Sequence, residues 1–237
     1  MYGLFPNLAE RRDTAAGVLS AYRDEAVCDA AASPNFALDD FVRSADTVYV
    51  SFPGAEQDLF APLVVALLEQ IRRAVYRRPS GWPPVVWALD EAANIAPLPS
   101  LPSVVSDGGS QGLVSLVCLQ DLSQARVRWG AAADGFFSLF GTKVVLGGIA
   151  DLQTLQLVSA LGGERYVPVE SETRPVGFSR QRVRTVTTSP QRLRVLPVEA
   201  VARGVPGHAL VISGRNPPGF VGLSPYWHPP WSALLTE

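Results

Sequence analysis

The chain has 237 residues, of which 47% are hydrophobic and 18% charged, and its formal net charge is −2 at pH 7. These values allow one domain with an appendage and a full hydrophobic core, and they exclude a disordered chain and a globally basic nucleic-acid binder. Two widely separated cysteines, Cys28 and Cys118, predict reduced, buried thiols rather than a disulfide, which suits the cytosol. The two histidines lack metal-ligand spacing, so the sequence does not predict a zinc site.

The first eighty residues predict helices interrupted by one strand. Residues 1–32 carry apolar residues at helical spacing, and a short helix is expected over 37–43. The β-branched and aromatic run at 47–52 (TVYVSF) predicts a strand. The broadest apolar stripe lies at 55–78 and predicts a long helix that ends at Pro79-Ser80-Gly81. There is no signal-peptide pattern, and the longest apolar stretch is too short to span a bilayer.

Two short apolar runs then end in polar residues, and they carry the most informative pattern. Val85–Leu89 ends in Asp90-Glu91, and the next run, expected as a strand covered on both faces, starts at Leu113 and ends in Gln120. In a parallel α/β sheet, ligands lie at the carboxyl ends of the strands. Adjacent carboxylates at that place fit a magnesium–nucleotide site, although many strands end in acids only because the following turn is solvated.

Helices and turns follow these two runs. Pro102 is expected to open a helix that ends near Gly108. A helix over 121–129 carries Arg126 and Arg128, which either contact phosphate or are solvated surface arginines. Further elements are expected in the order helix, strand and helix, at 131–139, 142–146 and 152–161.

After residue 165 the sequence becomes polar and rich in β-forming residues. Arg180, Arg182 and Arg184 alternate, so a strand would place all three on one face. That face either tracks DNA phosphates or is the solvated side of an edge hairpin, and the second alternative is favoured because no aromatic residues are interleaved. A short helix, a strand over 207–214 and a Pro- and aromatic-rich tail complete the chain, with Trp227 and Trp231 expected to be partly buried.

Several of these motifs occur in the same order in a known protein family. The stretch VVWALDEAANIAPLPSLPSVVSDGGSQGLVSLVCLQDLSQARVRWG is followed by GTKVVLGGIADLQTLQLVSALGG and later by GHALVISGRNPPG. Together they closely resemble the carboxyl-terminal part of type IV secretion coupling proteins, the TraG/TraD-like conjugative DNA-transfer ATPases, from about Ala45 to Pro218. The resemblance implies an α/β, RecA-like, mostly parallel sheet flanked by helices, with an incomplete N-terminal half and a β-rich C-terminal extension. It also implies a helical remnant at 1–44, a motor part at 45–218 and a tail at 219–237.

The resemblance further implies a function and a site. ATP and Mg²⁺ would be the cofactors of the complete motor, with Asp90 at the metal, Glu91 orienting the attacking water and Gln120 sensing the γ-phosphate. The implied partners are single-stranded DNA, a relaxase and secretion-channel proteins. The parent would be a hexamer anchored on the cytoplasmic side of the inner or plasma membrane.

One motif of that family is absent from the sequence. No segment has the phosphate-binding form G-x-x-x-x-G-K-[ST], and the single lysine, Lys143, follows the carboxylates. The sequence therefore predicts that an N-terminal half is supplied in cis or in trans and that this chain alone is inactive. The alternative is a non-catalytic RecA-like interaction module that docks a partner or substrate protein.

Overall fold

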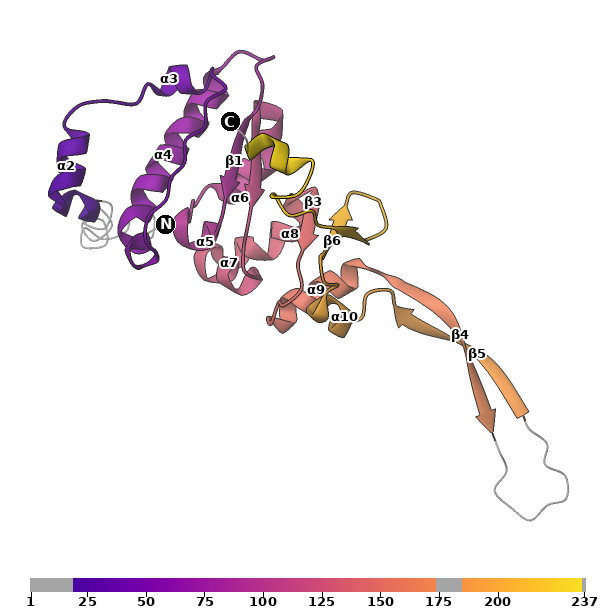
Figure 1. Ribbon diagram of the computed structural model, residues 1–237. Helices are drawn as coiled ribbons and strands as arrows, with labels where there is room; N and C mark the ends of the chain where they lie inside the picture. Colours follow the sequence, from indigo (N-terminus) through magenta and orange to yellow (C-terminus); the bar gives the residue numbers. More distant parts are fainter. Residues whose placement is uncertain (1–18, 174–184, 236–237) are drawn as a thin grey trace, which may run out of the picture. The chain divides into compact units, whose positions relative to one another are not determined.

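The computed structural model describes residues 19–173 and 185–235 and consists of two compact units, Met1–Phe140 and Gly141–Glu237. Each unit contains helices and its own strands (Figure 1). In the described ranges, no helix combines the length and apolar character that a bilayer crossing requires. The predicted arginine face at Arg180, Arg182 and Arg184 lies outside the described residues.

Helices dominate the start of the first unit. They are η1 (Ser20–Arg23), α2 (Glu25–Ala31), α3 (Leu38–Phe41), η2 (Gly54–Glu56) and α4 (Gln57–Arg77). Asp24 caps α2, since its carboxylate accepts a hydrogen bond from the backbone N–H of Ala26. The long helix expected over 55–78 is confirmed as α4, and the inner part of its apolar stripe is buried, including Val64, Leu68 and Ile71.

The strand predicted at 47–52 is wrong. Among the described residues no strand pairs with this segment, and Tyr49 is 90% exposed. β-branched and aromatic side chains favour an extended backbone, but a strand also needs a neighbour that satisfies its N–H and C=O groups. The strand–helix–strand unit expected before Asp90 is therefore reduced to α4 followed by β1.

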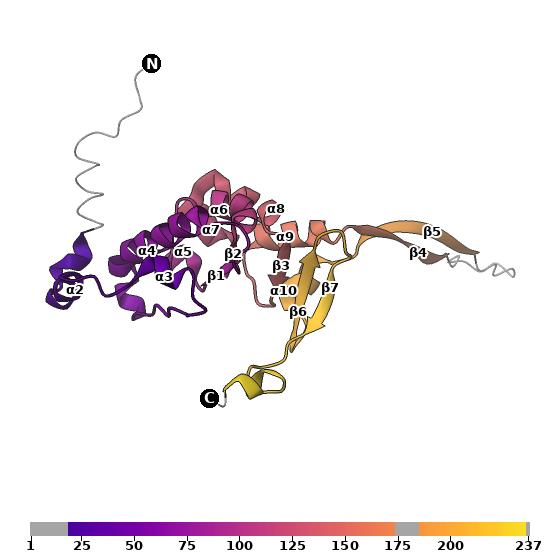
Figure 2. The same ribbon diagram turned by 90° about the horizontal axis from the view of Figure 1, so that it is seen from above.

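Among the described residues of the first unit, two strands form a sheet. β1 (Val85–Leu89) and β2 (Leu113–Val117) pair in parallel, with Leu89 opposite Val117, and β2 ends before the predicted Gln120. One face, with Trp87 and Leu113, is buried, and α6 and α7 lie on one side of the pair (Figure 2). The opposite face, formed by Val86, Ala88, Val114 and Leu116, is exposed. The expectation that both faces of the sheet are covered is therefore wrong.

Short helices share a core with the buried face of this sheet. They are α5 (Ala92–Ile95), α6 (Leu101–Asp107), η3 (Gly108–Gln111), α7 (Leu122–Trp129), η4 (Gly130–Gly135) and α8 (Phe136–Leu139). Pro102 lies in the first turn of α6, as predicted, whereas the helix expected over 131–139 is divided into η4 and α8. The ring of buried Phe136 packs on Trp129 at a centroid distance of 5.2 Å. Trp129 Nε1 donates to the carbonyl of Leu98 at 2.7 Å, so this core also holds the loop that follows Asp90-Glu91.

The strands of the second unit are antiparallel. β3 (Thr142–Val145), β6 (His208–Ser213) and β7 (Gly219–Gly222) form one sheet in the order β3-β6-β7, and β4 (Glu164–Thr173) pairs with β5 (Thr185–Arg194). The β-rich extension is thus present as a two-stranded ribbon that reaches away from α9 (Leu152–Leu161) and α10 (Val198–Arg203) (Figure 1). The expectation of a mostly parallel sheet is wrong for the described strands, because only β1 and β2 pair in parallel.

The tail carries the two tryptophans that the sequence predicts to be partly buried. Trp227 is 61% and Trp231 51% exposed, so each is covered only in part, and Trp231 begins the short helix η5 (Trp231–Leu235). Trp227 packs edge-on against Tyr226 at a centroid distance of 4.9 Å.

We expect Ser159→Ala to destabilise the second unit by about 1–3 kcal/mol. Ser159 is fully buried in α9, where its hydroxyl donates to the carbonyl of Leu196 at 2.5 Å and accepts from Arg194 Nη1 at 3.0 Å. Alanine would leave both partners unsatisfied. Urea denaturation followed by circular dichroism measures the change. Ser103→Ala, on the exposed side of α6, is the matched control, and equal effects of the two variants would contradict the expectation.

Candidate functional site

The carboxyl ends of the two parallel strands form a common edge. Asp90 directly follows β1, and Cys118 directly follows β2. The N–H of Cys118 donates to the carbonyl of Leu89 at 2.9 Å, and the carbonyl of Cys118 accepts from the N–H of Ala92 at 3.1 Å. The parallel ladder therefore continues one residue beyond the assigned strands, and it brings the Asp90-Glu91 turn against the end of β2.

Glu91 has a strained backbone at this edge. Its φ of 46° and ψ of 44° lie in the left-handed region, and no other non-glycine residue in the described ranges has a positive φ. This conformation turns the chain directly from β1 into α5, whose first residues, Ala92 and Ala93, are buried. Left-handed backbone at a side chain with a Cβ costs about 1–2 kcal/mol and is concentrated at functional sites. The sequence indicates Glu91 through its carboxylate and carries no signal for its left-handed backbone.

Gln120 lies three residues beyond β2, directly before Asp121, the N-cap residue of α7. Its side-chain oxygen accepts a hydrogen bond from Gln124 Nε2 at 2.8 Å, which leaves its amide NH₂ group to donate. Asp121 caps α7 by accepting from the backbone N–H of Ser123 at 2.8 Å. No hydrogen bond or ion pair given for the described ranges joins Gln120 to Asp90 or Glu91, so its role as a phosphate sensor stays a prediction.

Cys118 belongs to this edge and was missed as a site residue. It is a free thiol, as predicted, but both it and Cys28 are exposed, so the expected burial of the two cysteines is wrong. Partial burial of the thiol raises the pKa of Cys118, and the negative charge of Asp90 raises it further. The parallel register could have revealed this neighbour, because Cys118 is opposite Asp90 once Leu89 is opposite Val117.

This neighbour gives a chemical readout of Asp90. We expect Asp90→Asn, in a Cys28→Ser background, to accelerate alkylation of Cys118 by iodoacetamide near pH 8. The sign follows from the pKa: a raised thiol pKa keeps Cys118 protonated to higher pH, and removing the negative charge of Asp90 moves the rate profile to lower pH. Mg²⁺ bound at Asp90 should accelerate the reaction in the same direction, and it should have no effect in the Asp90→Asn protein. Equal alkylation rates in all these conditions would show that Asp90 neither raises the pKa of Cys118 nor binds Mg²⁺.

The donor set at this edge suits a magnesium ion that is shared with a ligand. Asp90 and Glu91 supply carboxylate oxygens, which Mg²⁺ prefers, and Mg²⁺ commonly takes one or two carboxylates and completes its shell with water and phosphate. The described residues contain no cluster of three or more His, Cys, Asp or Glu side chains able to enclose a metal by themselves. The two carboxylates therefore fit one side of a magnesium–nucleotide site, and the phosphate-binding side is not supplied by a motif in this sequence.

The predicted DNA-contacting arginines of α7 have carboxylate neighbours. Arg126 Nε lies 3.4 Å from Asp134, and Arg128 lies 3.8 Å from Asp58. Arg128 also lines a cavity of about 300 Å³ together with Asn94 from α5 and residues of α4. These pairs favour a structural role for both arginines, and phosphate contact by them stays a prediction.

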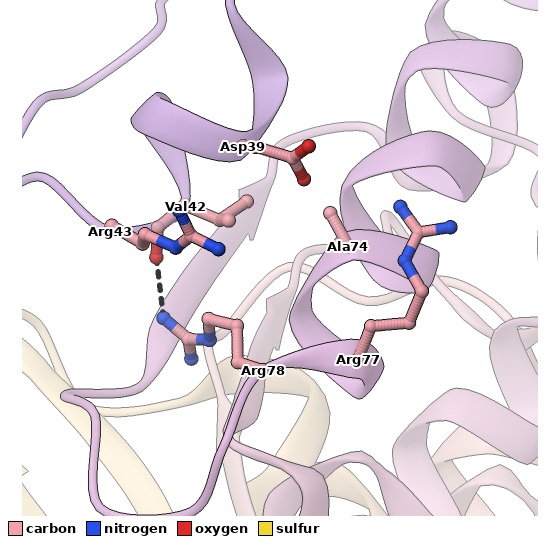
Figure 3. Close-up of a pocket in the computed structure, with 6 residues that line it drawn as sticks. All are labelled: Asp39, Val42, Arg43, Ala74, Arg77 and Arg78. Carbon is pink, nitrogen blue, oxygen red and sulfur yellow. Dashed lines mark hydrogen bonds between the residues drawn. The ribbon is translucent and has the colours of Figure 1, made fainter.

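A second cavity, of about 250 Å³, lies between α3 and the end of α4 and carries three arginines (Figure 3). Arg78 is structural there: it donates to the carbonyls of Val42 at 2.5 Å, Pro83 at 3.1 Å and Gly112 at 3.4 Å. Arg43 and Arg77 are exposed at its wall, which Asp39 also lines. Arginines at the end of α4 also compensate the helix dipole, so this cavity does not by itself define an anion site. Neither cavity includes Asp90, Glu91 or Gln120.

Solved structures share the fold of this chain. The bacterial conjugative coupling protein TrwBdeltaN70, in an unbound form, superposes with a TM-score of 0.64 at 22% identity over 80% of this chain and 44% of that chain. TrwB in complex with ADP and Mg²⁺ gives a TM-score of 0.62 at 23% identity, over 81% of this chain and 43% of the other. The complex of TrwB with the ATP analogue ADPNP gives 0.62 at 22% identity, over 80% and 43%. The chain thus spans less than half of the solved coupling proteins whose fold it shares.

The sequence family agrees with the fold. Residues 84–204 match the family described as the TraM recognition site of TraD and TraG. Because this match covers more than half of its residues, the chain belongs to the TraG/TraD-like family of coupling proteins, as the resemblance predicted. No protein with a curated function matches the sequence.

Proposed function

We propose that this chain is the C-terminal part of the ATPase domain of a conjugative coupling protein. In this proposal a RecA-like motor uses ATP to move single-stranded DNA and its relaxase to a type IV secretion channel. The observation that carries it is the position of Asp90 and Glu91 at the carboxyl end of β1, directly beside parallel β2, in a member of the TraG/TraD-like family. The solved complexes of TrwB with ADP and Mg²⁺ and with ADPNP support nucleotide as the ligand.

Each residue of the edge has a proposed task. Asp90 holds Mg²⁺, directly or through water, and its charge already acts on Cys118 next to it. The bound Mg²⁺ would neutralise developing charge on the phosphates. Glu91 orients and deprotonates the attacking water, and its left-handed backbone fixes where its carboxylate emerges from the sheet. Gln120 donates its free amide NH₂ group to the γ-phosphate, since its oxygen is held by Gln124.

The phosphate-binding loop comes from another part of the protein, in cis or in trans. The sequence contains no such loop, and the chain spans 44% of TrwBdeltaN70. We propose that residues 1–44 are a remnant of an inserted helical domain, that 45–218 belong to the motor and that 219–237 are a tail. The complete protein is then a hexamer anchored on the cytoplasmic side of the membrane, with Arg126, Arg128, Arg180, Arg182 and Arg184 as its candidate DNA contacts.

A second candidate function is a non-catalytic docking module. The description of the matching family as the TraM recognition site favours it, because that description names recognition of a partner protein. In this alternative the fold is retained and a relaxosome protein binds it without nucleotide turnover. A complete coupling protein could have both functions. For this chain alone they differ, because the first assigns it a part of the ATPase site and the second assigns it only partner binding.

Titration of the isolated chain with ATP and Mg²⁺ tests whether the phosphate-binding half of the motor lies outside this chain. We expect no tight binding, because the carboxylates provide only one side of the site. A restored upstream half should give DNA-stimulated ATP hydrolysis. Tight nucleotide binding by the chain alone would overturn the claim that its phosphate-binding half is elsewhere, and a completed protein that binds a relaxosome partner without hydrolysing ATP would favour the docking module.

A further inference from the structure

A strip of polar side chains joins the long helix α4 to both ends of α6. At the start of α6, the hydroxyl of its N-cap residue Ser100 donates a hydrogen bond to the carboxylate of Glu69 in α4. At the end of α6, the hydroxyl of Tyr76 in α4 donates to the Asp107 carboxylate at 3.1 Å. The two contact residues are seven positions apart on each helix, or about 10.5 Å of helical rise. The two helices therefore run side by side in the same direction, and α6 is fixed to α4 at two places.

Glu69 is itself held in place by Arg72, one turn further along α4. Arg72 Nε and Nη2 donate to one carboxylate oxygen of Glu69 at 2.9 and 2.7 Å, and Ser100 donates to the other. The Glu69 side chain is only 22% exposed. Partial burial acts to raise the pKa of Glu69, but the hydrogen bonds from Ser100 and Arg72 outweigh it and hold that pKa below its usual value. Glu69 is therefore an ionised anchor with both oxygens occupied.

The segment between Glu91 and Ser100 is hydrogen-bonded and tightly packed. The Glu91 carbonyl accepts from the N–H groups of Asn94 and Ile95 at 2.8 and 3.1 Å, which forms the single turn of α5. Well-packed interiors transmit strain instead of absorbing it, so a displacement at Ser100 reaches Glu91. The side chains that pack the segment are at most 1% exposed, and they are those of Ala92, Ala93, Ala96 and Leu98.

The loop between α5 and α6 depends on side-chain partners for its position. Pro97 and Pro99 lack a backbone N–H, which removes two donors from the loop. The Leu98 carbonyl between them accepts from Trp129 Nε1 at 2.7 Å, and Ser100 is held by Glu69. These two contacts come from α7 and α4, so two different helices fix the loop that follows the carboxylate pair.

We propose that Glu69 is a positioning residue for Glu91. Through Ser100 it fixes the loop that follows α5, and this loop holds the one-turn helix whose start requires the left-handed backbone of Glu91. A left-handed conformation at a residue with a Cβ is unfavourable by itself and persists only where its surroundings impose it. Glu69 supplies part of that restraint from α4, and it does so without being a member of the carboxylate edge.

The inference rests on the proposed function only in assigning a reaction to Glu91, so hydrogen exchange of this chain tests it without nucleotide. Ser100→Ala removes the one hydroxyl that links the loop to Glu69. We expect the amides of Asn94 and Ile95, which bond the Glu91 carbonyl, to exchange about tenfold faster, as for the loss of one hydrogen bond to a charged group. Ser100→Thr keeps a hydroxyl and should restore the parental rate. Unchanged exchange in Ser100→Ala would overturn the inference.

Tyr76→Phe is the matched control, because it also removes one hydroxyl from a contact between α4 and α6. That contact lies at the far end of α6, two turns from Ser100, so the α5 amides should keep their parental exchange rates. Equal acceleration by Tyr76→Phe and Ser100→Ala would show a general loosening of α6 and contradict the assignment to Glu69.

Glu69→Ala tests the same contact from the side of α4. Alanine is the best helix former, so α4 itself should be retained. This variant should accelerate exchange of the α5 amides at least as much as Ser100→Ala does. If the two residues act through one contact, adding Ser100→Ala to Glu69→Ala should cause no further acceleration, and additive effects would contradict the proposed route.

Kinetics of the completed coupling protein separate this inference from the proposed function. Ser100→Ala should lower kcat for ATP hydrolysis about tenfold and change KM by no more than about twofold, because a displaced Glu91 impairs attack by water and not nucleotide binding. Ser100→Thr should restore kcat, and Tyr76→Phe should retain it. Faster α5 exchange in Ser100→Ala, with no hydrolysis even by the parent, would leave the inference standing and reject the motor. Parental kcat in Ser100→Ala would overturn the inference and leave the motor standing.

Discussion

The Glu91→Gln variant of the completed coupling protein is expected to lose DNA-stimulated ATP hydrolysis by about 10²–10⁴-fold, the usual contribution of a positioned general base. Glutamine keeps the size of the side chain and can still hydrogen-bond a water, but it cannot accept the proton of that water. The left-handed backbone at Glu91 does not depend on the carboxylate, so the turn into α5 should be retained. Steady-state phosphate release measures the loss.

The control for this prediction is an equally conservative change of an exposed acid. Glu56→Gln, in η2, should leave the rate unchanged. Nucleotide binding measured with ADP and Mg²⁺ should persist in Glu91→Gln, which distinguishes a catalytic loss from a failure to assemble. Turnover at the parental rate in this variant would remove Glu91 from its assigned role and leave Asp90 as the remaining candidate of the pair.

The Phe136→Ala variant is expected to destabilise the first unit by about 3–5 kcal/mol, the range found for large aromatic side chains removed from cores. Phe136 is 2% exposed and packs against Trp129 and Phe140, at centroid distances of 5.2 and 6.1 Å. Trp129 in turn holds the carbonyl of Leu98, which follows the site. Because domains are stable by only about 5–15 kcal/mol, this change removes a large fraction of the total.

Urea denaturation followed by circular dichroism measures the effect of Phe136→Ala, with Val127→Ala as its control. Val127 lies in α7, the helix that carries Trp129, but its side chain is 82% exposed. Its truncation should therefore change the free energy of unfolding by no more than about 0.5 kcal/mol. A Phe136→Ala protein that unfolds at the parental urea concentration would show that the α7–α8 cluster is not the core of the first unit.

Local sequence pattern determined much of the first unit. The apolar stripe at 55–78 predicts α4 because a helix of that length needs only a periodic buried side, and Pro79 and Gly81 end it. The runs ending in Asp90 and Gln120 predict the two parallel strands, because buried strands are short, apolar and closed by polar turns. Asp151 predicts the start of α9 by capping, and its carboxylate does accept from the N–H of Thr154 at 3.0 Å.

Pairing between distant segments was decided by the tertiary structure. The segment 47–52 has strand composition but no strand partner, and β3 pairs antiparallel with β6, which lies more than sixty residues later. The left-handed backbone of Glu91 and the charge of Asp90 on Cys118 depend on how β1 meets β2. The sequence by itself thus determined the residues that end each strand, through local periodicity and turn chemistry. Only the tertiary structure decided which strands are neighbours and which faces stay bare, because hydrogen-bond pairing and burial depend on residues far apart in the chain.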